Sequence, residues 1–137
     1  MIGILLVSHG TIAQSFLEVA REILGDAEGI QAVGLPVTMD EEKVLEEIQK
    51  AKKSLDQGNG LLILTDMFGG TPCNLSFSFL EDDQVEVLTG MNLPMILKIL
   101  SAREGVTLPE LARTAMECGR ENIYMAREIL EQRTDKQ

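Results

Sequence analysis

The sequence is short of the residues on which several classes of site depend. Its 137 residues include one histidine, two cysteines and no tryptophan. Cys73 and Cys118 have neither CxxC nor metal-like spacing, so we interpret both as small buried apolar side chains. A metal site that uses several histidines or cysteines is therefore not expected, and we assign the chain no metal and no cofactor.

Basic side chains are also scarce. The chain has 12 lysines and arginines against 22 aspartates and glutamates, a formal net charge of -10 at pH 7. Proteins that bind nucleic acid rely on clustered lysine and arginine side chains to neutralise phosphates, so nucleic acid is not an expected partner. Protein partners that present basic patches fit this charge better.

Long apolar runs and linkers are missing as well. The apolar start, Met1 to Val7, is far too short to span a bilayer, and it lacks a charged leader and a cleavage-like segment. No Pro/Ala-rich or Ser-rich tract divides the chain, and 45% of its residues are apolar, which is enough for one core. We expect a cytoplasmic protein in which residues 1–137 form a single domain.

What the chain does contain is a regular alternation of strands and helices. Short apolar runs predict four strands, at Ile2–Val7, Ile30–Leu35, Leu61–Leu64 and Gln84–Leu88. Periodicity and end signals predict helices that begin after Gly10, Asp40, Thr71, Asn92 and Thr107. Strands separated by helices predict an α/β fold with a doubly wound, mostly parallel sheet and helices on both faces.

Several features of these helices can be tested directly. Thr11 with Gln14, and Thr107 with Glu110, have the spacing of a capping box. Thr71 is expected to cap a helix that begins at Pro72, and Asp40 to cap one that opens with Glu41 and Glu42. The expected buried faces are Ile12, Phe16, Val19, Ala20, Ile23 and Leu24 in the first helix, Val44, Ile48, Ala51 and Leu55 in the second, and Leu108, Leu111, Ala112 and Ala115 in the last.

The C-terminal region fits two interpretations. Apolar periodicity permits one helix from Leu108 to Leu130, although Gly119 interrupts it. The alternation of side chains from Ile123 to Ile129 fits a short edge strand equally well. The pattern by itself leaves both interpretations open.

His9 and Asp66 each follow a predicted strand of the sheet interior. In parallel sheets the first and third strands are commonly adjacent, and ligands usually bind where the carboxyl ends of such strands meet. The two side chains are therefore expected to meet in one crevice. Two alternatives stand beside this hypothesis: His9 as an isolated hydrogen-bonded histidine, and Asp66 as the cap of a turn.

A histidine oriented by a carboxylate suits phosphoryl transfer. The carboxylate fixes the ring tautomer, leaves the other ring nitrogen with its lone pair, and stabilises positive charge that develops on attack. Hydrolysis would normally need a further acid, base or metal ligand, and there is no second histidine. The expected donors to the phosphoryl oxygens are the hydroxyls of Thr11 and Thr71 and the backbone around Gly10, Gly69 and Gly70.

Three motifs, LLVSHG, LTDMFGGTPCN and TGMNLPM, occur in the order seen in a known family. Together they resemble the mannose-type IIA domain of the phosphoenolpyruvate-dependent sugar phosphotransferase system, over nearly the whole chain. The resemblance implies a flavodoxin-like fold in which His9 carries the phosphoryl group, Asp66 orients His9, and Thr71 lies at the phosphoryl site. Thr71 stands where serine is frequent and Phe68 where tryptophan is frequent, and neither departure removes the chemistry.

The same resemblance implies partners. Phosphate would pass from the carrier HPr to His9 and then to a IIB component, which we expect on a separate protein because this chain stops at Gln137. Membrane components of the IIC and IID type would be involved only indirectly. The resemblance also implies a homodimer in which a C-terminal antiparallel strand joins the partner's sheet, which favours a strand near Ile123 to Arg127 over the long helix.

Two other functions remain as alternatives. A regulatory phosphoprotein of an incomplete phosphotransferase system would be phosphorylated without passing phosphate to any IIB component. A tetrapyrrole metal chelatase can also begin with a strand that ends in His-Gly, but it would need further metal ligands, and the single histidine weighs against it. Histidine phosphatases rely on an Arg-His-Gly motif and a second histidine, whereas here Ser8 precedes His9.

Overall fold

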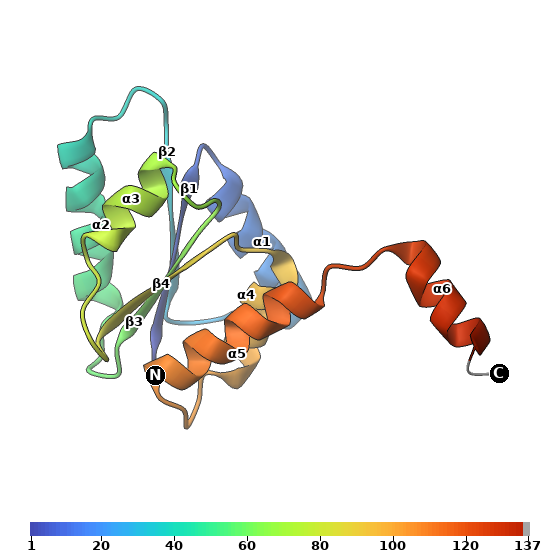
Figure 1. Ribbon diagram of the computed structural model, residues 1–137. Coiled ribbons are helices and arrows are strands. Elements are labelled where there is room, and N and C mark those ends of the chain that lie inside the picture. The colour runs from blue at the N-terminus through green and yellow to red at the C-terminus, as the bar shows by residue number, and fades with distance from the viewer. Residues whose placement is uncertain (136–137) are drawn as a thin grey trace.

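The computed structural model describes residues 1–135 and contains a sheet with helices on both faces (Figure 1). The strands are β1 (Gly3–His9), β2 (Ile30–Leu35), β3 (Leu61–Thr65) and β4 (Val85–Thr89). The helices are α1 (Ile12–Leu24), α2 (Glu41–Leu55), α3 (Thr71–Phe77), α4 (Leu93–Ala102), α5 (Leu108–Glu121) and α6 (Ala126–Asp135). The α/β class and the predicted strands are confirmed. No helix in this described part is long and apolar enough to cross a membrane.

The strands lie in the order β2-β1-β3-β4, and every neighbouring pair is parallel. The chain leaves β1 toward β2 and later returns to build β3 and β4 on the other side of β1. This flavodoxin-like order reverses between β1 and β3, the position where such sheets usually bind ligands. Val7 pairs with Thr65, so the carboxyl ends of β1 and β3 lie side by side.

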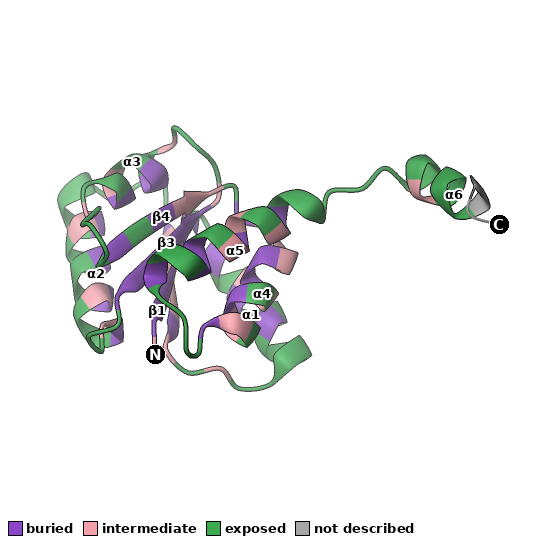
Figure 2. Cartoon of the chain, turned by 60° about the horizontal axis from the view of Figure 1, so that its bottom comes forward, coloured by how far each residue is buried: buried purple, intermediate pink, exposed green. Residues whose placement is uncertain are grey.

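Two apolar clusters cover the two faces of the sheet. Side chains of a strand alternate between its faces, so Ile4 and Leu6 pack with α1, α4 and α5, while Leu5 and Val7 pack with α2. The side chains of β3 from Leu61 to Leu64 are fully buried, as expected for a strand covered on both sides. Figure 2 shows this burial along the strands and exposed surface over the outer faces of the helices.

The buried face of α1 differs from the prediction. Its buried residues are Ala13, Leu17 and Ala20, whereas Ile12 and Ile23 are about half exposed. Apolar residues occupy two overlapping faces of this helix, so periodicity alone could not choose between them. The two alanines carry the smallest side chains available for close packing on the sheet. The predicted buried faces of α2 and α5 are confirmed in full.

Two of the four expected helix caps are wrong. The Asp40 side chain accepts a hydrogen bond from the Lys43 N–H, and Thr107 forms its capping box with Glu110, as predicted. Thr11 occupies the N-cap position of α1 but makes no side-chain capping bond there. In α3 the N-cap is Gly70, so Thr71 begins the helix and its side chain does not cap it. In both cases the backbone conformation of the turn before the helix, and not the residue type alone, determines which residue caps the helix.

The predicted C-terminal edge strand is not observed. Residues 123–125 have no regular structure, and Ala126–Asp135 forms α6, which stands away from the body of the molecule (Figure 1). Because no sheet edge lies beside it in a single chain, the segment satisfies its backbone groups within a helix. The alternative of one helix to Leu130 is also wrong, because α5 ends at Glu121. Gly119 does not break α5; it gives Met95 of α4 room to pack.

Candidate functional site

His9 is the last residue of β1, and its side chain is 48% exposed at the carboxyl edge of the sheet. Asp66 follows β3 directly, so the parallel pairing of β1 and β3 brings the two residues together. One carboxylate oxygen, Oδ2, accepts a hydrogen bond from the His9 backbone N–H at 2.9 Å and lies 2.7 Å from His9 Nδ1. The expected pairing of His9 and Asp66 is thus present in the fold.

The Asp66 carboxylate is held in its ionised form. Its side chain is only 11% exposed, and this burial acts to raise the pKa. Hydrogen bonds from the His9 backbone and ring, with the nearby imidazole charge, outweigh that effect and lower the pKa of Asp66 below its ordinary value. Oδ1 also accepts a hydrogen bond from the Met67 N–H at 3.1 Å, so Asp66 caps its turn while it holds His9.

Gly70 allows the loop after β3 to approach the imidazole. A β-carbon at this position would lie 2.7 Å from His9 Cε1 and 3.2 Å from Nε2. Gly69 has a different reason to be glycine, because its φ of +86° lies in the left-handed region. The double glycine therefore combines one residue needed for backbone conformation with one needed for space. It leaves Nε2 beside the loop, on the side of the ring away from Asp66.

Some of the other predicted site residues share a hollow with the His9 ring, and others do not. His9, Gly10 and Thr71 line a hollow of about 520 Å³, which Leu35, Val37 and Met39 bound on the β2 side. Thr11 and Gly69 are exposed at the same edge of the sheet but do not line this hollow. The structure thus gathers Gly10, Gly70 and Thr71 closest to His9.

Ser8 is a residue of this site that the sequence reasoning missed. It is fully buried directly before His9, and its Oγ donates a hydrogen bond to the His9 carbonyl at 3.0 Å. The same Oγ accepts a hydrogen bond from the Ala13 N–H in the first turn of α1, at 2.7 Å. The available signal in the sequence was a hydroxyl residue immediately before the histidine, at the end of the first predicted strand.

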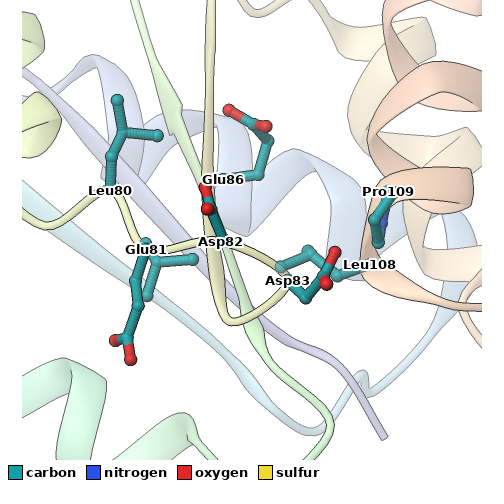
Figure 3. Close-up of a pocket in the computed structure, with 8 residues that line it drawn as sticks. Leu80, Glu81, Asp82, Asp83, Glu86, Leu108 and Pro109 are labelled. Atoms are coloured by element: carbon teal, nitrogen blue, oxygen red, sulfur yellow. The ribbon is translucent and has the colours of Figure 1, made fainter.

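A second hollow, of about 510 Å³, lies at the opposite end of β4 from His9 (Figure 3). Glu81, Asp82, Asp83 and Glu86 line it, and their carboxylates point in different directions. Within residues 1–135 no group of three or more His, Cys, Asp or Glu side chains is arranged to hold a metal ion. We assign no site to this acidic surface.

Two proteins with similar sequences are components of sugar phosphotransferase systems. The PTS system fructose-specific EIIA component of Bacillus subtilis is 30% identical over 132 residues, which cover 96% of this chain and 90% of that protein. The PTS system mannose-specific EIIAB component of Escherichia coli is 32% identical over 124 residues. That match covers 89% of this chain but only 38% of the longer EIIAB protein.

Solved structures agree with these sequence matches. The crystal structure of phosphotransferase system component EIIA from Streptococcus agalactiae superposes with a TM-score of 0.86 and 26% identity. The superposition covers 93% of this chain and 99% of that chain. The family model described as the PTS system fructose IIA component, EIIA-man, matches residues 3–116. The resemblance inferred from the three motifs is confirmed, and this chain belongs to the EIIA-man family.

Proposed function

We propose that this protein is a phosphoryl-carrier IIA component of a sugar phosphotransferase system and that His9 is the carrier residue. The observation that carries the proposal is the 2.7 Å contact between His9 Nδ1 and Asp66 Oδ2, on an imidazole that is 48% exposed at the sheet edge. Membership of the EIIA-man family supports it. The Bacillus subtilis and Escherichia coli relatives and the Streptococcus agalactiae structure are sugar phosphotransferase components, so neither the regulatory nor the chelatase alternative is favoured.

The reaction needs a lone pair on Nε2 and a proton on Nδ1. Asp66 accepts that proton in a hydrogen bond, so Nε2 is the free nucleophile. Nε2 forms a bond to the phosphorus of phospho-HPr while the bond that holds this phosphorus to HPr breaks. Transfer onward to a nucleophile on a IIB component is the same displacement with His9 as the leaving group, and Asp66 orients the ring in both steps.

The phosphoryl oxygens need hydrogen-bond donors. We assign this role to the Thr71 hydroxyl and to backbone N–H groups of Gly10, Gly69 and Gly70, with the Thr11 hydroxyl on the α1 side. Thr71 and Gly10 share the hollow beside His9, which supports their place in the set. Thr11 makes no capping bond to α1, so that helix does not require its hydroxyl.

The partners must reach His9 from solution. Val37, Met67 and Phe68 belong to the loops around the site and are more than half exposed, as the apolar centre of a docking surface would be. We propose HPr and a IIB component as successive partners through small, transient interfaces, with IIC and IID components met only indirectly. On the same basis we propose a cytoplasmic location.

We further propose that the protein is a homodimer. The segment Ile123, Tyr124 and Met125 is 76%, 66% and 64% exposed and leads to a helix that stands away from the sheet. Beside β4, an apolar hollow includes Phe68, Phe77 and Ile123 among its lining residues. A second copy of the chain would bury these side chains, which a lone molecule leaves in water.

The test of the carrier residue is phosphorylation by purified phosphoenolpyruvate, enzyme I and HPr. We expect the wild-type chain to gain one acid-labile phosphoryl group and His9→Ala to gain none. Addition of a IIB component should then remove the label from the wild type. A label on His9→Ala would contradict the assignment of the carrier, and a label that no IIB component removes would favour the regulatory alternative.

A further inference from the structure

Hydrogen bonds hold the backbone of His9 through both its N–H and its carbonyl. Its N–H donates to Asp66 Oδ2 at 2.9 Å, and its carbonyl accepts from Ser8 Oγ at 3.0 Å. The next N–H along the chain, that of Gly10, donates to the Leu35 carbonyl of β2 at 3.0 Å. Of these three contacts, only the one from Ser8 comes from a fully buried hydroxyl on the same strand as His9.

Ser8 Oγ is also the side-chain group that ties α1 to the end of β1. It accepts the Ala13 N–H at 2.7 Å, five residues along the chain, in the place of an ordinary N-cap. One buried hydroxyl therefore connects the carbonyl of His9 to the first turn of α1. From this geometry we infer that Ser8 is a positioning residue for phosphoryl transfer at His9, an inference that rests on the proposed function.

The imidazole has little room for displacement. Oδ2 of Asp66 lies 2.7 Å from Nδ1, and Gly70 approaches so closely that a β-carbon there would lie 2.7 Å from Cε1. If the His9 carbonyl lost its donor, a small rotation of that peptide would lengthen the bond to Asp66 or press the ring against the loop. Displacements of an ångström or less at a reacting group cost large factors in rate.

If Ser8 acted only as a helix cap, its loss would lower stability without a specific loss of transfer rate. The chain offers a matched control for this possibility. Thr107 also caps a helix through its hydroxyl, because it accepts a hydrogen bond from the Glu110 N–H at the start of α5. Thr107 lies near the opposite end of the sheet from His9, since α5 starts close to Gly60, which precedes β3. Thr107→Ala therefore removes a helix cap without touching the site.

The experiment compares steady-state transfer from phospho-HPr through the protein to an excess of a IIB component, in wild type, Ser8→Ala, Ser8→Thr and Thr107→Ala. Ser8→Ala should lower kcat about tenfold or more while KM stays within about a factor of two, because the docking surface is intact. Thr107→Ala should keep the wild-type kcat despite a comparable loss of melting temperature. Ser8→Thr retains the hydroxyl and should recover most of the rate.

Each outcome decides the inference. A wild-type kcat in Ser8→Ala, or a change confined to KM, would overturn it. So would a kcat in Thr107→Ala that falls as far as that in Ser8→Ala, because the effect would then follow from stability. If Ser8→Thr does not fold, the comparison of the two alanine variants still decides. Failure of wild type to accept any phosphoryl group would instead overturn the proposed function, and this inference with it.

Discussion

At the residue scale, the two ring nitrogens of His9 have different surroundings. Nδ1 faces a carboxylate that is nearly buried, whereas Nε2 lies beside the Gly70 backbone at the open edge of the sheet. Imidazole nitrogens differ in reactivity when a partner fixes the tautomer. The proposed carrier role of His9 requires this asymmetry, which rests on the 2.7 Å contact between Nδ1 and Asp66 Oδ2.

Asp66→Asn should slow phosphoryl transfer roughly 10²-fold, because an amide neither fixes the tautomer nor stabilises the ring cation as a carboxylate does. The melting temperature should change by only a few degrees, about the effect of 1 kcal/mol. The control is Asp56→Asn, since Asp56 accepts a hydrogen bond from the Gly58 N–H in a turn at the other end of the sheet. Equal transfer rates in the two variants would mean that Asp66 is only a turn cap.

Acid should weaken the contribution of Asp66 to stability. Hydrogen bonds from His9 hold the pKa of this carboxyl below its ordinary 3.8, so the ionised form favours the folded state. The contribution is complete above the ordinary pKa and disappears as the pH falls through the lowered one. Urea titrations of wild type and Asp66→Asn should therefore differ by a constant amount near neutral pH and converge below about pH 4. A difference that grows in acid would contradict this sign.

The two glycines of the loop should respond differently to alanine. Gly70→Ala is compatible with the backbone but places a β-carbon 2.7 Å from His9 Cε1, so transfer should fall about tenfold or more. Gly69→Ala meets no neighbour within 4 Å but forces a φ of +86° on alanine. It should cost about 1 kcal/mol of stability. Similar kinetics in the two variants would show that Gly70 is not in contact with the ring.

At the element scale, Asn92 joins α4 to α5. Its Oδ1 accepts the Met95 N–H at 3.1 Å as the cap of α4, and its Nδ2 donates to the Gly119 carbonyl at 2.9 Å. Gly119 in turn packs on Met95, where a β-carbon would lie 2.7 Å from its terminal methyl. One side chain of the TGMN motif thus holds two helices that cover the same face of the sheet.

Asn92→Ala should therefore cost more stability than loss of a cap alone. Thr107→Ala removes only a cap and should cost about 1 kcal/mol. Asn92→Ala also removes the bond to α5, which should add about 1 kcal/mol to the loss. Urea denaturation of both variants measures the difference, and equal losses would show that the contact with Gly119 contributes little.

At the scale of the whole molecule, the segment after α5 packs little against the rest of the protein. Ile123, Tyr124 and Met125 expose most of their surface, and α6 extends away from the sheet (Figure 2). The outer edge of β4 has no neighbouring strand within the described chain. In a symmetric dimer, the exposed segment of one copy can cover the open edge of β4 in the other copy.

Truncation after Asn122 should convert a dimer into a monomer. The cut leaves α5 intact, because that helix ends at Glu121 and Asn122 is its C-cap. Sedimentation velocity should find dimers of the full chain and monomers of the truncated chain at the same concentration. Removal of residues 136–137 alone is the matched control and should leave the dimer in place. A truncated chain that remains dimeric would contradict the proposal.

The sequence by itself determined the elements whose local signals agree. Fully apolar runs predicted buried strands, Asp40 and Thr107 predicted helix starts, and α2 had a single apolar face to bury. The three motifs identified the family, and the position of His9 and Asp66 after adjacent strands predicted their meeting. Strand period is a local rule, so it succeeded without knowledge of the fold. The meeting of His9 and Asp66, 57 residues apart, was predicted instead from the usual strand order of parallel sheets.

Only the tertiary structure decided the rest. The face of α1 depends on which side chains fit against the sheet, and periodicity offered two faces. Ser8, near the end of β1, caps α1 in place of Thr11, because its hydroxyl lies within reach of the Ala13 N–H. Likewise Gly70, and not Thr71, occupies the N-cap of α3. The chain after Glu121 lies beside no sheet edge in the described structure, and Ala126–Asp135 forms α6 instead of a strand.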